Sequence, residues 1–210
     1  MTAPSAIVLR QACEQVSGCD PVLARAYAVV DLPTWRRTQA TYQSLARIVV
    51  YQLISTRAAD AIWQRLLAHQ PAMTARSLLE DDPQALLACG LSRPKLGHLQ
   101  AIAEAIESRV LDFDHLASAP PDDARKTLLS VRGIGPWTAE TFLMNALGCL
   151  DAFPHGDVGL IEAYRQLSGA TERLPTKAFS GLAEAWRPYR AVGAHLLYDW
   201  LSQQRDREKD

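Results

Sequence analysis

The most informative segment of this 210-residue sequence is Leu129-Ser-Val-Arg-Gly-Ile-Gly-Pro-Trp-Thr-Ala139. Gly133 and Gly135 lie between two helix-forming segments and permit backbone angles that other residues rarely adopt. Pro136 has the φ angle that suits the first turn of a helix, and Ile134 is expected to anchor the turn in the core. The pattern therefore predicts a helix, a tight turn and a second helix.

The predicted turn is also a candidate anion site. Glycines keep side chains away from the main chain, so a phosphate can approach the backbone N–H groups. The start of the second helix adds unpaired N–H groups and a partial positive charge, and Arg132 adds a full charge. Two glycines between helices are also compatible with a tight corner that binds nothing, so spacing alone leaves both interpretations open.

Helical periodicity extends through the rest of the chain. Apolar residues recur at intervals of three and four, and strand-like alternation is not evident. Asp20-Pro21 and Asp82-Pro83 each resemble an N-cap followed by proline at the first helical position. The sequence therefore predicts an all-α fold. The main predicted helices are 41–55, with Leu53 on its buried face, 58–70, 94–109, 123–131, 136–147, 157–167 and 187–204.

A second segment, Phe153-Pro-His-Gly-Asp-Val-Gly159, interrupts the helical pattern. Its carboxylate, Asp157, can stabilise a developing positive charge or activate a water molecule. It can equally cap the helix that begins at Val158. The two roles are compatible, because N–H donors at a helix start favour the ionised carboxylate.

Taken together, the hairpin and this loop resemble the helix-hairpin-helix (HhH-GPD) DNA glycosylase superfamily. That family is named for its hairpin and for a Gly/Pro-rich loop that ends in an aspartate. Three further segments resemble its 3-methyladenine DNA glycosylase II branch, so that the likeness covers about residues 35 to 200. They are Gln52-Leu-Ile-Ser55, Gly90-Leu-Ser-x-x-Lys95 and Trp186-x-Pro-Tyr-Arg190.

The resemblance implies a two-lobed helical fold with the active-site cleft between the lobes. Residues 41–150 would form the central lobe that ends in the hairpin. Residues 1–40 would pack with the other lobe, in which residues 151–210 supply the catalytic loop and the C-terminal helices.

It also implies a role for each candidate site residue. Asp157 occupies the position of the catalytic aspartate, and Trp137 replaces the Schiff-base lysine of lyase members and offers a ring for a flipped base. Leu53 matches the residue that fills the gap in the duplex, and Tyr198 aligns loosely with a pocket aromatic. Burial in the core remains an alternative for all three apolar or aromatic side chains. Arg132, Gly133, Ile134 and Gly135 would contact DNA.

The implied activity is monofunctional hydrolysis of the N-glycosidic bond of alkylated purines, such as 3-methyladenine and 7-methylguanine, at the start of base excision repair. The expected partner is double-stranded DNA with damaged bases, bound by a monomer. The alternative is a non-catalytic hairpin module that binds DNA. Such a module needs Gly133 to Gly135 but has no use for Asp157 or Leu53.

No cofactor is expected. The cysteines Cys13, Cys19, Cys89 and Cys149 form no cluster, and the histidines lack ligand spacing, so we expect no metal centre. Relatives hold a monovalent cation at hairpin carbonyls, which sequence does not reveal.

Charge and hydropathy set the remaining expectations. The net charge of −1 means that any DNA contact must come from a local group of cations. No apolar run is long enough to cross a bilayer, and residues 1–10 do not resemble a secretory signal. We therefore expect an intracellular protein without membrane contact, in the cytoplasm beside the nucleoid or in the nucleus.

Overall fold

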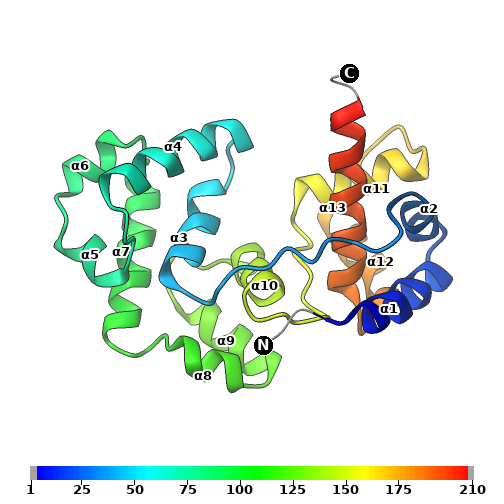
Figure 1. The fold of residues 1–210 in the computed structure, drawn as a ribbon, viewed down its shortest axis with the longest axis horizontal. Helices are drawn as coiled ribbons and strands as arrows, with labels where there is room; N and C mark the ends of the chain where they lie inside the picture. The colour runs from blue at the N-terminus through cyan, green and yellow to red at the C-terminus, as the bar shows by residue number, and fades with distance from the viewer. Residues whose placement is uncertain (1–3, 208–210) are drawn as a thin grey trace. The chain divides into compact units, whose positions relative to one another are not determined.

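The computed structural model describes residues 4–207, which form thirteen α-helices and one short 3₁₀ helix and contain no strand (Figure 1). The predicted all-α class is therefore confirmed. The chain divides into two compact units. Unit 1 combines the residues up to Arg37 with those from Gly148 onward, and unit 2 is the continuous segment Thr38–Leu147.

Unit 2 is organised around α7 and α3, which pack against each other. α7 also contacts α5 and α6, and α3 also contacts α4 and α10. The shared core includes Leu45, Leu99, Ile102 and Phe142, which are fully buried. The helices of unit 2 are α3 (Tyr42–Tyr51), α4 (Thr56–His69), α5 (Ala75–Glu80), α6 (Pro83–Ala88), α7 (Arg93–Glu107), α8 (Phe113–Ser118), α9 (Pro121–Ser130) and α10 (Pro136–Asn145).

The end of α3 differs from the predicted helix 41–55. α3 stops at Tyr51, and Leu53 lies in a turn with a φ of +58° and a fully exposed side chain, at 102% of its reference area. The interpretation of Leu53 as a core leucine is therefore wrong. The physical reason is Ser55, whose hydroxyl accepts the N–H of Ala58 at 3.3 Å and starts α4. An N-cap has extended backbone angles, so one helix cannot continue through it.

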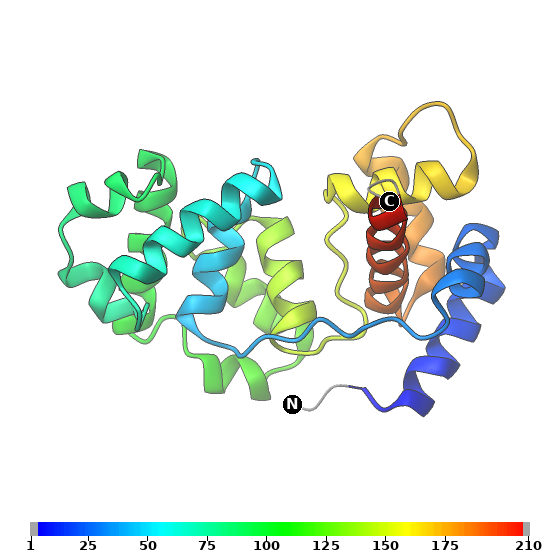
Figure 2. The ribbon, with the colours of Figure 1, turned by 45° about the horizontal axis from the view of Figure 1, so that its top comes forward.

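Unit 1 packs the first two described helices against the last one. α13, shown in red, lies beside α2 and α1, shown in blue, and also packs on α11 (Figure 2). Its core includes Leu23, Phe179, Trp186 and His195, each at most 1% exposed. The helices of unit 1 are α1 (Ala6–Cys19), α2 (Pro21–Val30), α11 (Val158–Ser168), α12 (Thr176–Ala183), η1 (Glu184–Trp186) and α13 (Arg190–Arg207).

A buried carboxylate, Asp20, joins these helices. It caps α2 through the N–H of Val22 at 2.8 Å, with Pro21 at the first helical position, as predicted from the sequence. It also accepts hydrogen bonds from the indole N–H of Trp186 at 3.0 Å and from the hydroxyl of Tyr164 at 3.2 Å. One side chain thus links the start of α2 to Trp186 and Tyr164.

Candidate functional site

The predicted hairpin is present between α9 and α10, which pack against each other. The turn is closed by the N–H of Ile134, which donates to the carbonyl of Val131 at 3.1 Å. Gly133 has a φ of +93°, and a Cβ at this position would lie 2.6 Å from the Cβ of His98. Both the backbone angle and this close approach require glycine. Ile134 is 4% exposed, so it anchors the turn in the core as expected.

α10 begins at the tip of the hairpin without a side-chain cap from residues 4–207. Its N-cap is Gly135, Pro136 occupies the first helical position, and the described residues supply no side-chain cap. The first N–H groups of a helix have no partner within the helix. Gly135 and Arg132 are both exposed. The hairpin therefore presents a helix start without a side-chain cap from the described residues and one exposed cation, an arrangement that can bind a phosphate.

An ion pair that the sequence did not reveal braces the hairpin. Arg125 on α9 binds Glu140 on α10 through its Nε atom at 2.5 Å, and the Glu140 side chain is 10% exposed. The two residues are far apart along the chain, so only the packing of the hairpin brings them together. Glu140 lies one turn beyond Trp137, and the pair thus fixes the helix that carries that ring.

The turn that carries Leu53 is fastened to the same helix. Gln52 donates its side-chain N–H to the hydroxyl of Thr138 at 2.5 Å, and Thr138 is 1% exposed. Trp137, the preceding residue, is partly buried. Unit 2 therefore groups Leu53, Trp137 and the hairpin on adjoining segments.

Asp157 lies at the start of α11 in unit 1 and caps that helix. Its Oδ1 atom accepts the N–H of Leu160 at 3.0 Å. The loop before it is tightly folded, because the N–H of Asp157 donates to the carbonyl of Pro154 at 2.8 Å. The capping role that the sequence allowed is thus present, and the carboxylate remains partly exposed.

Tyr198 on α13 meets Asp157 within unit 1. Burial raises the pKa of the Tyr198 phenol well above its usual value, and the charge of Asp157 and a hydrogen bond to it raise that pKa further. Gly159 leaves room for the carboxylate, because a Cβ there would lie 3.0 Å from Asp157 Oδ1. The contact between Tyr198 and Asp157 could not be foreseen from the sequence.

Arg36 contacts both Tyr198 and the next residue, Asp199. Its guanidinium carbon is 5.1 Å from the centroid of the Tyr198 ring, and its Nη2 atom binds Asp199 at 2.7 Å. The candidate residues therefore fall into two sets. Leu53, Arg132, Gly133, Ile134, Gly135 and Trp137 belong to unit 2, whereas Asp157 and Tyr198 belong to unit 1.

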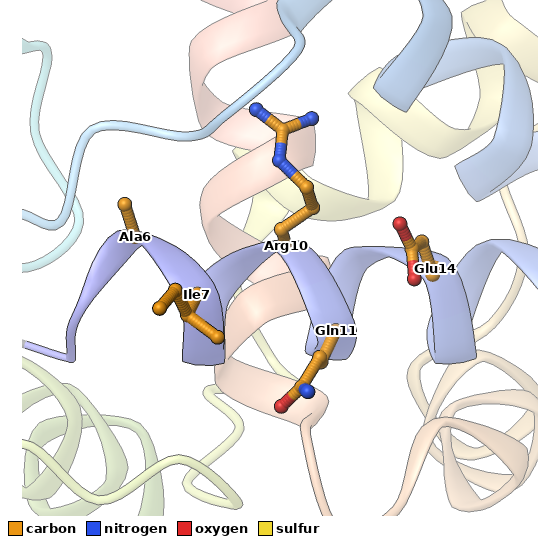
Figure 3. A pocket seen from close by; sticks show the side chains of 5 residues that line it. All are labelled: Ala6, Ile7, Arg10, Gln11 and Glu14. Carbon is orange, nitrogen blue, oxygen red and sulfur yellow. The ribbon is translucent and has the colours of Figure 1, made fainter.

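Other features of the described chain lie apart from these two sets. A shallow hollow on α1 is lined by Ala6, Ile7, Arg10, Gln11 and Glu14 (Figure 3). Residues 4–207 contain no group of three or more His, Cys, Asp or Glu side chains that could hold a metal ion. Over the same range, every helix is too short or too polar to cross a membrane.

Comparison with known proteins gives consistent relatives. The chain is 31% identical over 91% of its length to a probable bifunctional transcriptional activator/DNA repair enzyme AlkA of Mycobacterium tuberculosis, of which it spans 40%. It resembles the solved structure of Schizosaccharomyces pombe 3-methyladenine DNA glycosylase Mag1 in complex with abasic DNA, with a TM-score of 0.79 and 25% identity. That match covers 89% of this chain and 95% of the other.

A DNA-3-methyladenine glycosidase from Bacillus halodurans is 30% identical in sequence, with a TM-score of 0.73. This match covers 93% of this chain and 91% of that one. Residues 46–188 match the model of the HhH-GPD superfamily base excision DNA repair proteins. The matched range includes the turn of Leu53, the hairpin and the loop of Asp157. The chain belongs to the HhH-GPD superfamily of base excision DNA repair proteins.

Proposed function

We propose that this protein is a monofunctional DNA glycosylase that removes alkylated purines from double-stranded DNA. The observation that carries the proposal is the placement of Asp157, whose carboxylate is held by the N–H of Leu160 and by the hydroxyl of Tyr198. The names of the S. pombe and B. halodurans relatives specify 3-methyladenine, and the name of the M. tuberculosis relative specifies DNA repair. The alternative of a hairpin module without catalysis explains the cap on α11 but not the second donor, the Tyr198 hydroxyl, on the same carboxylate.

In the proposed reaction, the bond between C1′ of the sugar and the ring nitrogen of the base breaks. The base leaves with the bonding electrons, and the sugar develops oxocarbenium character. Asp157 would stabilise that positive charge and take a proton from the water that attacks C1′. Because alkylation makes the purine cationic, the base leaves neutral without being protonated first.

Trp137 sets the type of enzyme in this proposal. A lysine at this position could form a Schiff base with the sugar and cleave the strand, whereas an indole cannot. Water is therefore the nucleophile, and the product keeps an intact abasic site. The indole would also attract a cationic purine stacked on its face, by about 0.5–2 kcal/mol.

For DNA binding, the hairpin and Leu53 have separate tasks. The uncapped N–H groups of α10 and the charge of Arg132 would hold a phosphate, while Leu53 would fill the gap that the flipped nucleotide leaves. We propose that a monomer binds the duplex, in the compartment that holds the DNA, beside the nucleoid or in the nucleus.

The proposed hydrolysis uses water and the Asp157 carboxylate, so its chemistry requires no cofactor. A monovalent cation could still assist phosphate binding at the hairpin. The Val131 carbonyl already accepts the N–H of Ile134, and a carbonyl oxygen keeps a second lone pair for such an ion.

The test is single-turnover excision from duplexes that differ in one base: 3-methyladenine, 7-methylguanine, uracil or 8-oxoguanine. We expect release of the two alkylated purines and no covalent protein–DNA adduct after borohydride treatment. Asp157→Asn should lower the excision rate by about a hundredfold or more while DNA binding persists.

Three results would count against parts of the proposal. Duplex binding with no base release would favour the non-catalytic module. Wild-type rates in Asp157→Asn would show that another group acts as the catalytic carboxylate. Release of uracil or 8-oxoguanine with the alkylated purines untouched would reject the substrate class.

A further inference from the structure

Leu53 combines two features that are costly for an isolated chain. Its φ of +58° lies in the left-handed region, which is unfavourable for a residue other than glycine. Its side chain, although apolar, is fully exposed. A conformation of this kind persists only where the surrounding structure enforces it.

Lys95 supplies the first constraint. It extends from α7, and its Nζ atom donates a hydrogen bond to the carbonyl of Val50 at 2.6 Å. Val50 belongs to the last turn of α3, where carbonyl groups lack partners within the helix and attract positive charge. The ammonium is partly buried, and this burial lowers the pKa of Lys95. Lys95 is therefore committed to the end of α3.

Gln52 supplies the second constraint. Its backbone N–H donates to the carbonyl of Val49 at 3.3 Å, and its side chain reaches the buried hydroxyl of Thr138 at 2.5 Å. Thr138 lies in the first turn of α10, directly after the hairpin and Trp137. This contact sets the position of the turn relative to the phosphate-binding end of α10.

We propose that Lys95 and Gln52 are positioning residues that hold Leu53 ready to enter the duplex. We call the two hydrogen bonds, Lys95 to Val50 and Gln52 to Thr138, the wedge clamp. The wedge clamp fixes where α3 ends, keeps the Leu53 side chain outward and couples its position to the hairpin. The inference rests on the proposed function, because it needs a protein that opens the duplex.

The wedge clamp makes a prediction that differs from that of a phosphate contact. A lysine that binds a phosphate contributes to the salt dependence of DNA affinity, with a slope of roughly one counterion for each contact. A lysine that positions Leu53 affects the opening of the duplex instead. The two roles of Lys95 can thus be separated by measuring affinity and opening on the same variants.

The experiment uses the full chain and a duplex that contains a tetrahydrofuran abasic analogue beside 2-aminopurine, whose fluorescence rises when it is unstacked. Lys95→Met and Thr138→Val each remove one bond of the wedge clamp at nearly constant shape. Lys126→Met is the matched control, because Lys126 is exposed on α9 of the same unit and pairs only locally, with Asp123 at 3.2 Å. Circular dichroism and thermal unfolding would confirm that each variant is folded.

We expect Lys95→Met and Thr138→Val to lower the fluorescence rise severalfold and the single-turnover excision of 7-methylguanine by about tenfold. The salt slope for undamaged duplex should stay unchanged in both. Lys95→Arg keeps a charged donor and should restore much of the signal, and Lys126→Met should open the duplex as the wild type does.

An unchanged fluorescence rise in folded Lys95→Met and Thr138→Val would overturn the inference. A salt slope that falls by about one in Lys95→Met, with opening intact, would make Lys95 a phosphate contact instead. Because the abasic duplex reports opening without excision, a wild type that opens this duplex but releases no base would contradict the proposed function and not the wedge clamp. A wild type that binds without opening would overturn the wedge clamp itself.

Discussion

At the scale of single residues, Asp157 shows how one carboxylate serves two purposes. One oxygen caps α11 through the N–H of Leu160, and the side chain also receives the hydroxyl of Tyr198. These donors fix the orientation of the group before any substrate binds. Fixed orientation is what electrostatic stabilisation of a transition state requires.

Tyr198→Phe should therefore impair the proposed chemistry more than the fold. The ring and its contact with Arg36 remain, but the hydrogen bond to Asp157 is lost. We expect single-turnover excision of 7-methylguanine to slow by about tenfold, with duplex affinity unchanged. Tyr27→Phe, a change on α2 of the same unit, is the matched control. Equal rates in both variants would remove Tyr198 from the machinery.

His195 should make stability depend on pH. It is fully buried, its ring is 4.4 Å from that of Trp35, and its ring nitrogens have no partner among residues 4–207. Burial, with help from the charge of Arg36, lowers the pKa of His195 to about 3. The native state therefore keeps the ring neutral, while the unfolded chain binds a proton near pH 6.5.

It follows that the free energy of unfolding is retained above pH 6.5 and declines as the pH falls from there toward 3. The contribution of His195 amounts to about 1.4 kcal/mol per pH unit at most. His195→Phe keeps an aromatic ring beside Trp35 and cannot titrate, so its denaturation midpoint should fall less steeply with acid. Parallel curves for the two proteins between pH 6.5 and 4.5 would contradict this assignment.

At the scale of elements, local signals in the sequence were enough for most helices. The Asp-Pro pairs start α2 and α6 as predicted, and Gly90, with a φ of +99°, follows the end of α6. Periodicity failed at the end of α3, because a regular apolar spacing continues through Gln52 and Leu53 although the helix does not. Ser55 starts α4 and so excludes one continuous helix, and the turn between the helices is also contacted by Lys95 and Thr138, which are distant in sequence.

Among the candidate site residues, too, some positions follow from local sequence rules and others depend on contacts between distant residues. The glycines and the buried Ile134 of the hairpin follow from local backbone rules, so the sequence was sufficient to place them. The contact between Tyr198 and Asp157 depends on how α13 packs on α11, which no local rule describes. The sequence identified the loop of Asp157 and the ring of Tyr198 as candidates, but it did not reveal that the two side chains are in contact.

The brace of the hairpin offers a test of element packing. Glu140→Gln should lower the free energy of unfolding by about 1–3 kcal/mol, because it leaves the partly buried Arg125 without a charged partner on α10. Asp122→Asn is the matched control, because Asp122 contacts the same Arg125 but its side chain is 84% exposed. It should cost at most about 0.5–1 kcal/mol. Urea denaturation measures both, and equal losses would mean that burial of Glu140 has no effect.

At the scale of the whole molecule, the net charge of −1 bears on the proposed DNA binding. The net charge does not favour a polyanion, so in the proposed mode of binding a few contacts at the hairpin supply the affinity. We expect the logarithm of affinity for undamaged duplex to fall linearly with the logarithm of salt concentration. Arg132→Met should reduce that slope by about one. An affinity that does not change between low and moderate salt would exclude the hairpin as a phosphate site.

The division of the chain has a consequence for how the protein is made. Unit 2 is one continuous segment, and its two ends meet where the N–H of Thr38 donates to the carbonyl of Asn145 at 3.0 Å. Unit 1 needs α13 to cover α1 and α2. During synthesis, unit 2 can therefore fold while the apolar faces of α1 and α2 remain uncovered, until α13 has been translated. α1 and α2 are thus translated before unit 2 but buried after it, and a chain stalled before α13 would expose them to chaperones and proteases.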